Sequence, residues 1–275
     1  MDKKEVLDKI NTELQIQGKS KQTQKAYCYF NEKFLDFINK TPEKIEEGDV
    51  KKFLANLLSN KKYDPASVGL ARSALKFFYD NILKTKIMAD IKTPKKQRKL
   101  PDVLTRDEVK KLIEEAGSLR NKLLIELMYS SGLRVSECAS LKINDLNLSD
   151  KTGLLKLGKG GKDRFFVLSS KMIDDLKEHI KDKKDSDYIF SGVNGSLGVR
   201  AVQRVISRIA VRAGIKKRVY CHLLRHAFAT HLLEGGTDIR LIQELMGHSS
   251  LTTTQFYTKV SKEQLKTVKN PLDSL

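Results

Sequence analysis

The stretch KTPKKQRKLP at residues 92–101 constrains the fold of this chain more than any other. It holds five basic residues, two prolines and no acidic residue. Proline disfavours helix at its own position and at the residue before it, so this stretch predicts an extended linker. We therefore expect a domain at residues 1–91, a basic linker at 92–104 and a second domain at 105–275. A basic linker can lie along a phosphate backbone or remain a solvated tether, and its composition leaves both open.

The net charge of the chain favours a polyanionic partner. Lys and Arg number 52 and Asp and Glu 34, a formal net charge of +18. Nucleic acid is the first candidate and an anionic membrane the second, although a host with basic proteins in general would also explain the excess. No apolar run has membrane-spanning length, and the N-terminal MDKKEVLDKI lacks the apolar core of a signal peptide. The scattered Cys28, Cys138 and Cys221 form no CxxC pair, which fits a cytoplasmic, nucleoid-associated protein without disulfides or a cysteine zinc site.

Apolar periodicity predicts a mainly helical fold. Residues 1–91 show four amphipathic segments, the last opened by Asp64 as N-cap and by the proline that follows it. In the second domain, Thr105 and Glu108 have the spacing of a capping box. Further helices are expected up to Gly117 and near 120–130, 170–182, 199–213, within 221–236 and near 237–246. The segment GLLKLGKGGKDRFFVL predicts two strands around a glycine-rich turn, a small β-hairpin.

The segment CHLLRHAFATHLLEGG concentrates histidine in an apolar helix. His222 and His226 are four residues apart, but the HExxH metal motif would need Glu where Leu223 stands, and the cation of Arg225 opposes a metal. We therefore predict no metal site, and we expect His226 and His231 to be packed or capping residues. His222 and Arg225 share one helix face and could present a base and a fixed cation to one anion.

Two other segments carry candidate anion-binding residues. GLLKLGKG resembles a phosphate-binding P-loop, but Gly160 replaces the required Ser or Thr, and the apolar alternation continues as a strand. Lys159 and Lys162 remain at a hairpin tip, where they could reach an anion or only face solvent. In SGLRVSE, Arg134 follows a tight turn and could hold a phosphate. The alternative is a surface arginine that pairs with Glu137.

The helix VRAVQRVISRIAVRAG carries a basic stripe. Arginines recur every four residues, and valines and isoleucines form the opposite face. This pattern suits a helix docked on DNA, with a solvated face as the alternative. The stripe consists of Arg200, Arg204, Arg208 and Arg212.

Taken in order, these motifs resemble the tyrosine recombinase (phage integrase) family, most closely its Xer site-specific recombinases. The resemblance covers the whole chain and rests on SGLRVSE, GKGGKDR, HLLRH, GHSS and FYTKVS. Phe256 and Lys259 depart from the residues common beside the family's tyrosine, and the ending KNPLDSL lacks the usual His-Pro-Arg form, which puts details of subunit contact in doubt. The resemblance implies a C-shaped clamp in which a helical core-binding (SAM-like) domain and the catalytic domain grip one duplex. The implied catalytic residues are Arg134, Lys159, His222, Arg225, His248 and Tyr257, with Glu137 orienting the site.

The resemblance also implies the chemistry and the partners. Tyr257 would attack DNA to form a 3′-phosphotyrosyl link, without metal, ATP or another cofactor. The enzyme would act as a homotetramer on two synapsed double-stranded sites, with a C-terminal helix at about 262–268 exchanged between subunits. Resolution of chromosome dimers is the expected role, with or without a partner recombinase or activator. The alternatives are the integrase of a mobile element or virus, a type IB topoisomerase, and a non-catalytic DNA-binding protein.

Overall fold

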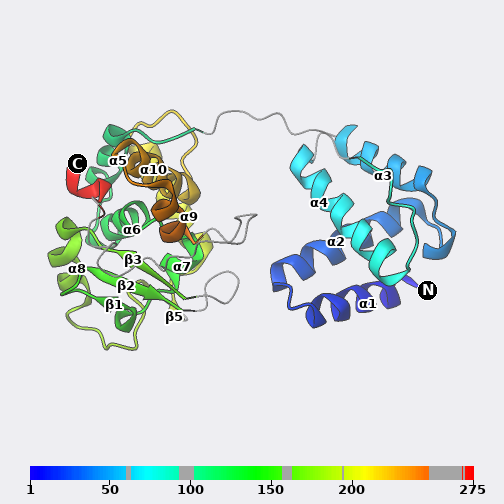
Figure 1. Ribbon diagram of the computed structural model, residues 1–275, viewed down its shortest axis with the longest axis horizontal. Helices are drawn as coiled ribbons and strands as arrows, with labels where there is room; N and C mark the ends of the chain where they lie inside the picture. The colour runs from blue at the N-terminus through cyan, green and yellow to red at the C-terminus, as the bar shows by residue number, and fades with distance from the viewer. Residues whose placement is uncertain (60–62, 93–101, 157–162, 194, 248–267, 269) are drawn as a thin grey trace. The chain divides into compact units, whose positions relative to one another are not determined.

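The computed structural model describes residues 1–59, 63–92, 102–156, 163–193, 195–247, 268 and 270–275. The chain forms two compact units, Met1–Leu100 and Pro101–Leu275 (Figure 1). Where the chain is described, helices dominate both units, and two small antiparallel sheets lie in the second. This confirms the predicted mainly helical fold class with a small β-structure.

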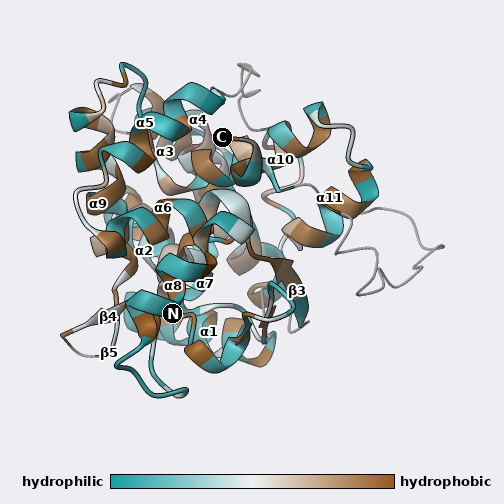
Figure 2. Cartoon of the chain, turned by 90° about the vertical axis from the view of Figure 1, so that its left-hand side faces the viewer, coloured by the Kyte–Doolittle hydropathy of each residue, from teal (hydrophilic) through white to brown (hydrophobic). Residues whose placement is uncertain are grey.

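In the described part of the N-terminal unit, four helices surround one apolar core. They are α1 (Lys3–Ile16), α2 (Lys21–Ile38), α3 (Glu47–Ser59) and α4 (Pro65–Lys76), with a 3₁₀ turn at Pro42–Lys44 and a π-helical turn at Phe77–Ile82. The α4 N-terminus is capped as predicted, because the Asp64 carboxylate accepts from the Ser67 backbone N–H at 2.7 Å. Each helix buries one face, and the hydrophobic and hydrophilic segments accordingly alternate along the ribbons of Figure 2.

The C-terminal unit contains seven further helices within the described ranges. They are α5 (Arg106–Glu114), α6 (Leu119–Ser130), α7 (Val135–Ala139), α8 (Ile173–Ile180), α9 (Val199–Arg212), α10 (Cys221–Glu234) and α11 (Ile239–Met246), with 3₁₀ turns at Ile143–Asp145, Ser170–Met172 and Pro271–Ser274. The capping box of α5 is present as predicted. The Thr105 hydroxyl accepts from the Glu108 N–H, and the Glu108 carboxylate accepts from the Thr105 N–H.

Two helices of this unit, α6 and α10, are buried on nearly all sides and pack against each other. A helix that is apolar all round belongs in a core, and this explains why CHLLRHAFATHLLEGG is so apolar. His231 lies between the two helices, with its Nδ1 2.9 Å from the Tyr129 hydroxyl. Burial lowers the pKa of His231, with a smaller contribution from Arg106. The expectation that His231 is a packed residue is therefore confirmed.

The predicted hairpin is the main part of a three-stranded antiparallel sheet. Its strands are β1 (Leu146–Asn147), β2 (Thr152–Leu155) and β3 (Arg164–Val167), in the order β1-β2-β3. The pairing of Leu155 with Arg164 is the last before the glycine-rich turn, whose residues 157–162 lie outside the described ranges. A second small sheet pairs β4 (Ser191–Gly192) with β5 (Gly195–Ser196). These very short strands carry no periodicity that the sequence could reveal.

The chain end returns to the C-terminal unit. Asn270 donates to the Ser130 carbonyl at 2.9 Å and accepts from the Leu272 N–H at 3.1 Å, and Leu272 is buried. The turn Pro271–Ser274 thus packs on α6 of its own chain. The predicted exchange helix at 262–268 lies, apart from Val268, outside the described residues.

Candidate active site

Among the described residues, Arg225 is the largest fully buried side chain, with 1% of its surface exposed. It projects from α10, where Nη1 donates to the Gly132 carbonyl and Nη2 to the Met246 carbonyl. Its Nε–H has no hydrogen-bond partner among the described residues. Burial lowers the pKa of Arg225 to about 10, with smaller contributions from Arg134 and Arg164. The side chain therefore stays a cation at neutral pH.

A glycine allows the backbone to approach this guanidinium. Gly132 has φ +58°, a left-handed conformation that glycine adopts without strain. A Cβ at this position would lie 2.4 Å from a ring carbon of Phe228 and 3.3 Å from the sulfur of Met246. Any larger residue would therefore push away the turn whose carbonyl holds Arg225.

Arg134 is the N-cap of the short helix α7 and contacts both this helix and the end of α11. Its backbone N–H donates to Glu137 Oε2 at 2.7 Å, Nη1 donates to Glu137 Oε1 at 2.8 Å, and Nη2 donates to the Gly247 carbonyl at 2.9 Å. The pairing with Glu137, considered above as an alternative to phosphate binding, is thus real. It fixes the guanidinium without using all five of its N–H donors, and the side chain keeps 24% of its surface exposed.

A third arginine, Arg164, was not singled out from the sequence. It is the first residue of β3, and only 8% of its side chain is exposed. Nη1 and Nη2 donate to the two oxygens of Glu137 at 2.8 Å each, and Nε donates to the Leu245 carbonyl at 3.2 Å. The sequence shows only a charged residue at the start of an apolar strand. Because exposed strand ends show the same pattern, it does not indicate that Arg164 is buried.

Glu137 is the common partner of two of these arginines. Burial of the Glu137 carboxylate raises its pKa, but the hydrogen bonds from Arg164 and from the Arg134 backbone outweigh burial and lower the pKa to about 2. The carboxylate is therefore ionised at any physiological pH. It offsets part of the charge of the arginines around it, which would otherwise repel one another.

The three guanidinium groups converge on three consecutive carbonyls. Leu245, Met246 and Gly247 stand at the C-terminal end of α11 and accept from Arg164, Arg225 and Arg134 respectively. The last carbonyls of a helix have no partner within it and carry the negative end of its dipole. Figure 2 shows α11 beside α10, and the same view includes β3. This cluster joins the end of α11 to the segments that carry Arg134 and Arg225.

His222 lies on α10, three residues before Arg225, and is exposed. Its ring packs edge-on against His226, with 4.4 Å between the ring centroids. His226 is half-buried, in accord with its expected packing role. Three other predicted site residues, Lys159, His248 and Tyr257, lie outside the described residues. The described range 195–247 nevertheless ends at Gly247, directly before His248, and β3 begins five residues after Lys159.

The arginines of α9 divide into two groups. Arg200, Arg204 and Arg208 are exposed, opposite the buried Val202, Ile206 and Ile209. Arg212 differs from the other arginines of the predicted stripe: its Nη2 donates to the carbonyls of Glu115, at 2.6 Å, and Ala116, at 3.2 Å. Arg212 is exposed as well, but these two bonds cap the end of α5 and give it a structural role that the predicted stripe did not include.

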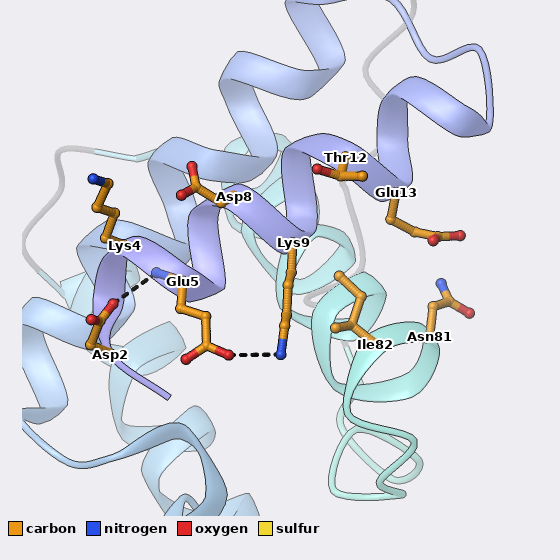
Figure 3. A pocket seen from close by; sticks show the side chains of 9 residues that line it. All are labelled: Asp2, Lys4, Glu5, Asp8, Lys9, Thr12, Glu13, Asn81 and Ile82. Carbon is orange, nitrogen blue, oxygen red and sulfur yellow. Dashed lines mark hydrogen bonds and ion pairs between the residues drawn. The ribbon is translucent and has the colours of Figure 1, made fainter.

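The hollow drawn in Figure 3 does not suit DNA. It has a volume of about 590 Å³ and lies along α1 of the N-terminal unit. Four acidic and two basic side chains line it, and Glu5 and Lys9 pair across 2.8 Å.

Across the described ranges, no three His, Cys, Asp or Glu side chains form a group that could hold a metal ion. None of the described helices is long and apolar enough to cross a membrane.

Comparisons with known proteins identify the class. Residues 102–264 match the Phage integrase family, and residues 6–89 match the N-terminal SAM-like domain of phage integrases. The chain therefore belongs to the phage integrase family. Within it, the chain is a Xer-like, site-specific tyrosine recombinase, an enzyme that cuts and rejoins DNA.

The relatives that support this include both sequences and structures. Tyrosine recombinase XerA of Pyrococcus furiosus is 40% identical over 275 residues, which cover 95% of this chain and 92% of the relative. The crystal structure of XerA recombinase matches with a TM-score of 0.53 and 32% identity over 96% of each chain. XerH site-specific recombinase, bound to its difH substrate before cleavage, matches with a TM-score of 0.68 and 27% identity, over 87% of this chain and 78% of XerH.

Proposed function

We propose that this chain cuts and rejoins a double-stranded DNA recombination site through a 3′-phosphotyrosyl intermediate on Tyr257. The observation that carries the proposal is the buried cation of Arg225, which two backbone carbonyls hold beside the Arg134–Glu137 pair. A buried guanidinium is costly unless an anion completes its environment. In a recombinase of this family, a phosphate of the bound DNA would be this anion.

The arginines would stabilise the transition state. Attack of the tyrosine oxygen on phosphorus gives a pentacoordinate state with extra negative charge on the non-bridging oxygens. Arg134 and Arg225 would donate to these oxygens, and His248 would add a third donor. Donors that are already oriented cost no reorganisation when the charge develops, and removal of one such donor typically slows a reaction by about 10²- to 10³-fold. Glu137 would keep Arg134 in place.

Two proton transfers accompany the attack. An unperturbed tyrosine has a pKa near 10 and is a poor nucleophile at neutral pH. His222, exposed at the start of α10, would accept its proton. The leaving group is a 5′-hydroxyl, which needs a proton in turn, and Lys159 would supply it. Lys162 is the weaker candidate for this acid. Each step exchanges one phosphate ester for another, so the bond energy is retained and neither ATP nor a metal is required.

The DNA interface would be dominated by phosphate contacts from the exposed arginines of α9 and the basic linker. We expect Arg204→Ala combined with Arg208→Ala to weaken DNA binding and to reduce the slope of log K against log salt by about 2. Cleavage at saturating protein should persist. The measurement is fluorescence anisotropy of labelled duplex at 50–200 mM salt. For the wild-type protein, affinity should fall by about a thousandfold or more over this range if roughly 6–10 phosphates are contacted.

Arg212→Ala is the matched control from the same helix. Because Arg212 caps α5, this change should lower the melting temperature and leave the salt slope unchanged. A double variant with the wild-type slope, or an Arg212→Ala protein with the larger change in slope, would contradict the proposed interface.

The proposed assembly is a homotetramer that synapses two DNA sites, with the exchange helix at about 262–268 docked on a neighbouring subunit. The proposed role is resolution of chromosome dimers at the nucleoid. This role calls for a chromosomal site at which two duplexes exchange strands. A single recombinase is sufficient for this role, and a second recombinase would be compatible with it.

The experiment that tests the function uses two distinguishable duplexes that carry a candidate chromosomal site. The wild-type protein should join the arms of one duplex to those of the other, without ATP and in the presence of EDTA. Relaxation of supercoils without exchanged arms would indicate topoisomerase activity instead. Binding with no broken strand would indicate a non-catalytic DNA-binding protein.

A further inference from the structure

The strongest unexplained feature of the site is Arg164, a buried arginine that the proposed chemistry does not use. Its guanidinium makes three hydrogen bonds, two to Glu137 on α7 and one to the Leu245 carbonyl at the end of α11. The side chain therefore joins β3, α7 and α11 through one rigid planar group. Lysine, with a single ammonium on a flexible stem, cannot reproduce this forked geometry.

Each element that Arg164 joins leads to a proposed catalytic residue. Arg134 is the N-cap of α7, and His248 follows the end of α11. Lys159 precedes the first residue of β3 by five positions in the sequence. The Arg164 guanidinium donates to Glu137 and to the Leu245 carbonyl, so it would act through these neighbours and not by direct contact with DNA.

Packing along the Arg164 stem strengthens the connection to α11. Gly247 has φ +56°, and a Cβ there would lie 2.8 Å from Cδ and 3.1 Å from Nε of Arg164. The end of α11 therefore rests directly on the arginine side chain. A change in Arg164 would move the residue that immediately precedes His248.

Arg164 also controls how Glu137 is shared. Glu137 Oε1 accepts from Nη1 of both Arg134 and Arg164, each at 2.8 Å. If Arg164 withdrew, the carboxylate would be free to turn onto Arg134 as a bidentate pair, the arrangement that Arg and carboxylate favour. The N–H groups of Arg134 that the phosphate needs would then be occupied by Glu137.

We infer that Arg164 is a positioning residue, which holds Glu137 and the end of α11, the two groups that bind the Arg134 guanidinium, so that Arg134 stays oriented toward the phosphate. This inference rests on the proposed function. It assigns Arg164 no contact with DNA. It predicts a defect in the chemical step and not in binding.

The test compares Arg164→Lys with the wild type in single-turnover cleavage of a nicked suicide substrate at saturating protein. Misplacement of catalytic groups by about 1 Å can cost on the order of 10²-fold, so we expect cleavage to slow by about ten- to a hundredfold. The DNA dissociation constant should change by less than about threefold. Arg120→Lys is the matched control, because Arg120 is exposed on α6 and donates to the side chain of its neighbour Asn121. It should cleave at the wild-type rate.

A double-mutant cycle distinguishes positioning from general stability. If Arg164 acts through Arg134, then Arg164→Lys should cost less than about threefold in an Arg134→Ala background, because contacts within one network are not additive. A merely structural role would lower the melting temperature and keep the full rate effect in that background. Glu137→Asp, which withdraws the carboxylate from both arginines, is the second variant should Arg164→Lys fold poorly, and its defect should be non-additive with Arg134→Ala as well.

The outcomes are separable. Arg164→Lys with the wild-type cleavage rate, or with an additive defect, would overturn the positioning role and leave the recombinase function standing. A wild-type protein that forms no covalent adduct would overturn the proposed function and this inference with it. Slow cleavage with intact binding and a collapsed effect in the Arg134→Ala background would support the inference.

Discussion

Tyr257→Phe is expected to abolish the covalent protein–DNA adduct, with cleavage reduced by roughly 10⁴-fold or more. Phenylalanine lacks the oxygen that would form the bond to phosphorus, so no neighbouring group can compensate. The assay incubates the protein with a duplex nicked near the cleavage site, whose short strand diffuses away after cleavage and traps the adduct. Denaturing gel electrophoresis then separates the linked protein from the free protein.

The polarity of the link and a matched control make this result specific. Digestion of the trapped DNA should show that the tyrosine is attached to a 3′-phosphate. Tyr220→Phe, an exposed tyrosine of the same unit, should form the adduct as the wild type does. An undiminished adduct in Tyr257→Phe would remove Tyr257 from its proposed role, even if recombination itself were observed.

Lys159→Ala is expected to slow cleavage by about 10²- to 10⁴-fold, which corresponds to roughly 3–5 kcal/mol of barrier. An alkoxide is a poor leaving group without a proton, and a lysine in the glycine-flanked turn between β2 and β3 is placed in sequence to supply one. DNA affinity should remain nearly intact, since a single phosphate contact contributes little to a phosphate-dominated interface. Single-turnover rates at saturating protein give the comparison.

A substrate with sulfur in place of the bridging 5′-oxygen provides the sharper test of the acid. A thiolate leaves without a proton, so Lys159→Ala should cleave this substrate at close to the wild-type rate. Arg134→Ala should gain no such rescue, because its proposed role is to stabilise charge on the other oxygens. Should sulfur rescue Lys162→Ala and not Lys159→Ala, the acid would be Lys162.

The local structure of this chain was largely predictable from its sequence. The caps at Asp64 and Thr105 and the apolar repeats of the helices rest on contacts within about one helical turn. The hairpin of β2 and β3 follows from alternation on both sides of a glycine-rich turn. Such features depend on neighbours along the chain, and their residue spacing can be read directly.

The arginines of α9 show where periodicity misleads. A spacing of four residues advances about 40° beyond a full turn of an α-helix, so after three such steps the side chain has drifted by about 120°. Arg212 has therefore rotated away from Arg200, and its guanidinium reaches the carbonyls at the end of α5. The stripe was regular in the sequence but not in space.

The order of the motifs was enough to predict the recombinase family and to select Arg134, Glu137, His222 and Arg225 as site residues. Tertiary structure alone decided that Arg225 is buried and that Arg164, absent from the predicted site, binds Glu137. The contacts responsible join residues 27, 93 and 113 positions apart, from Arg164 to Glu137, from Arg225 to Gly132 and from Arg134 to Gly247. The sequence around a charged residue does not indicate which distant carboxylate or carbonyl it will contact. Burial and pairing of charge arise only when packed helices bring those groups together and exclude water.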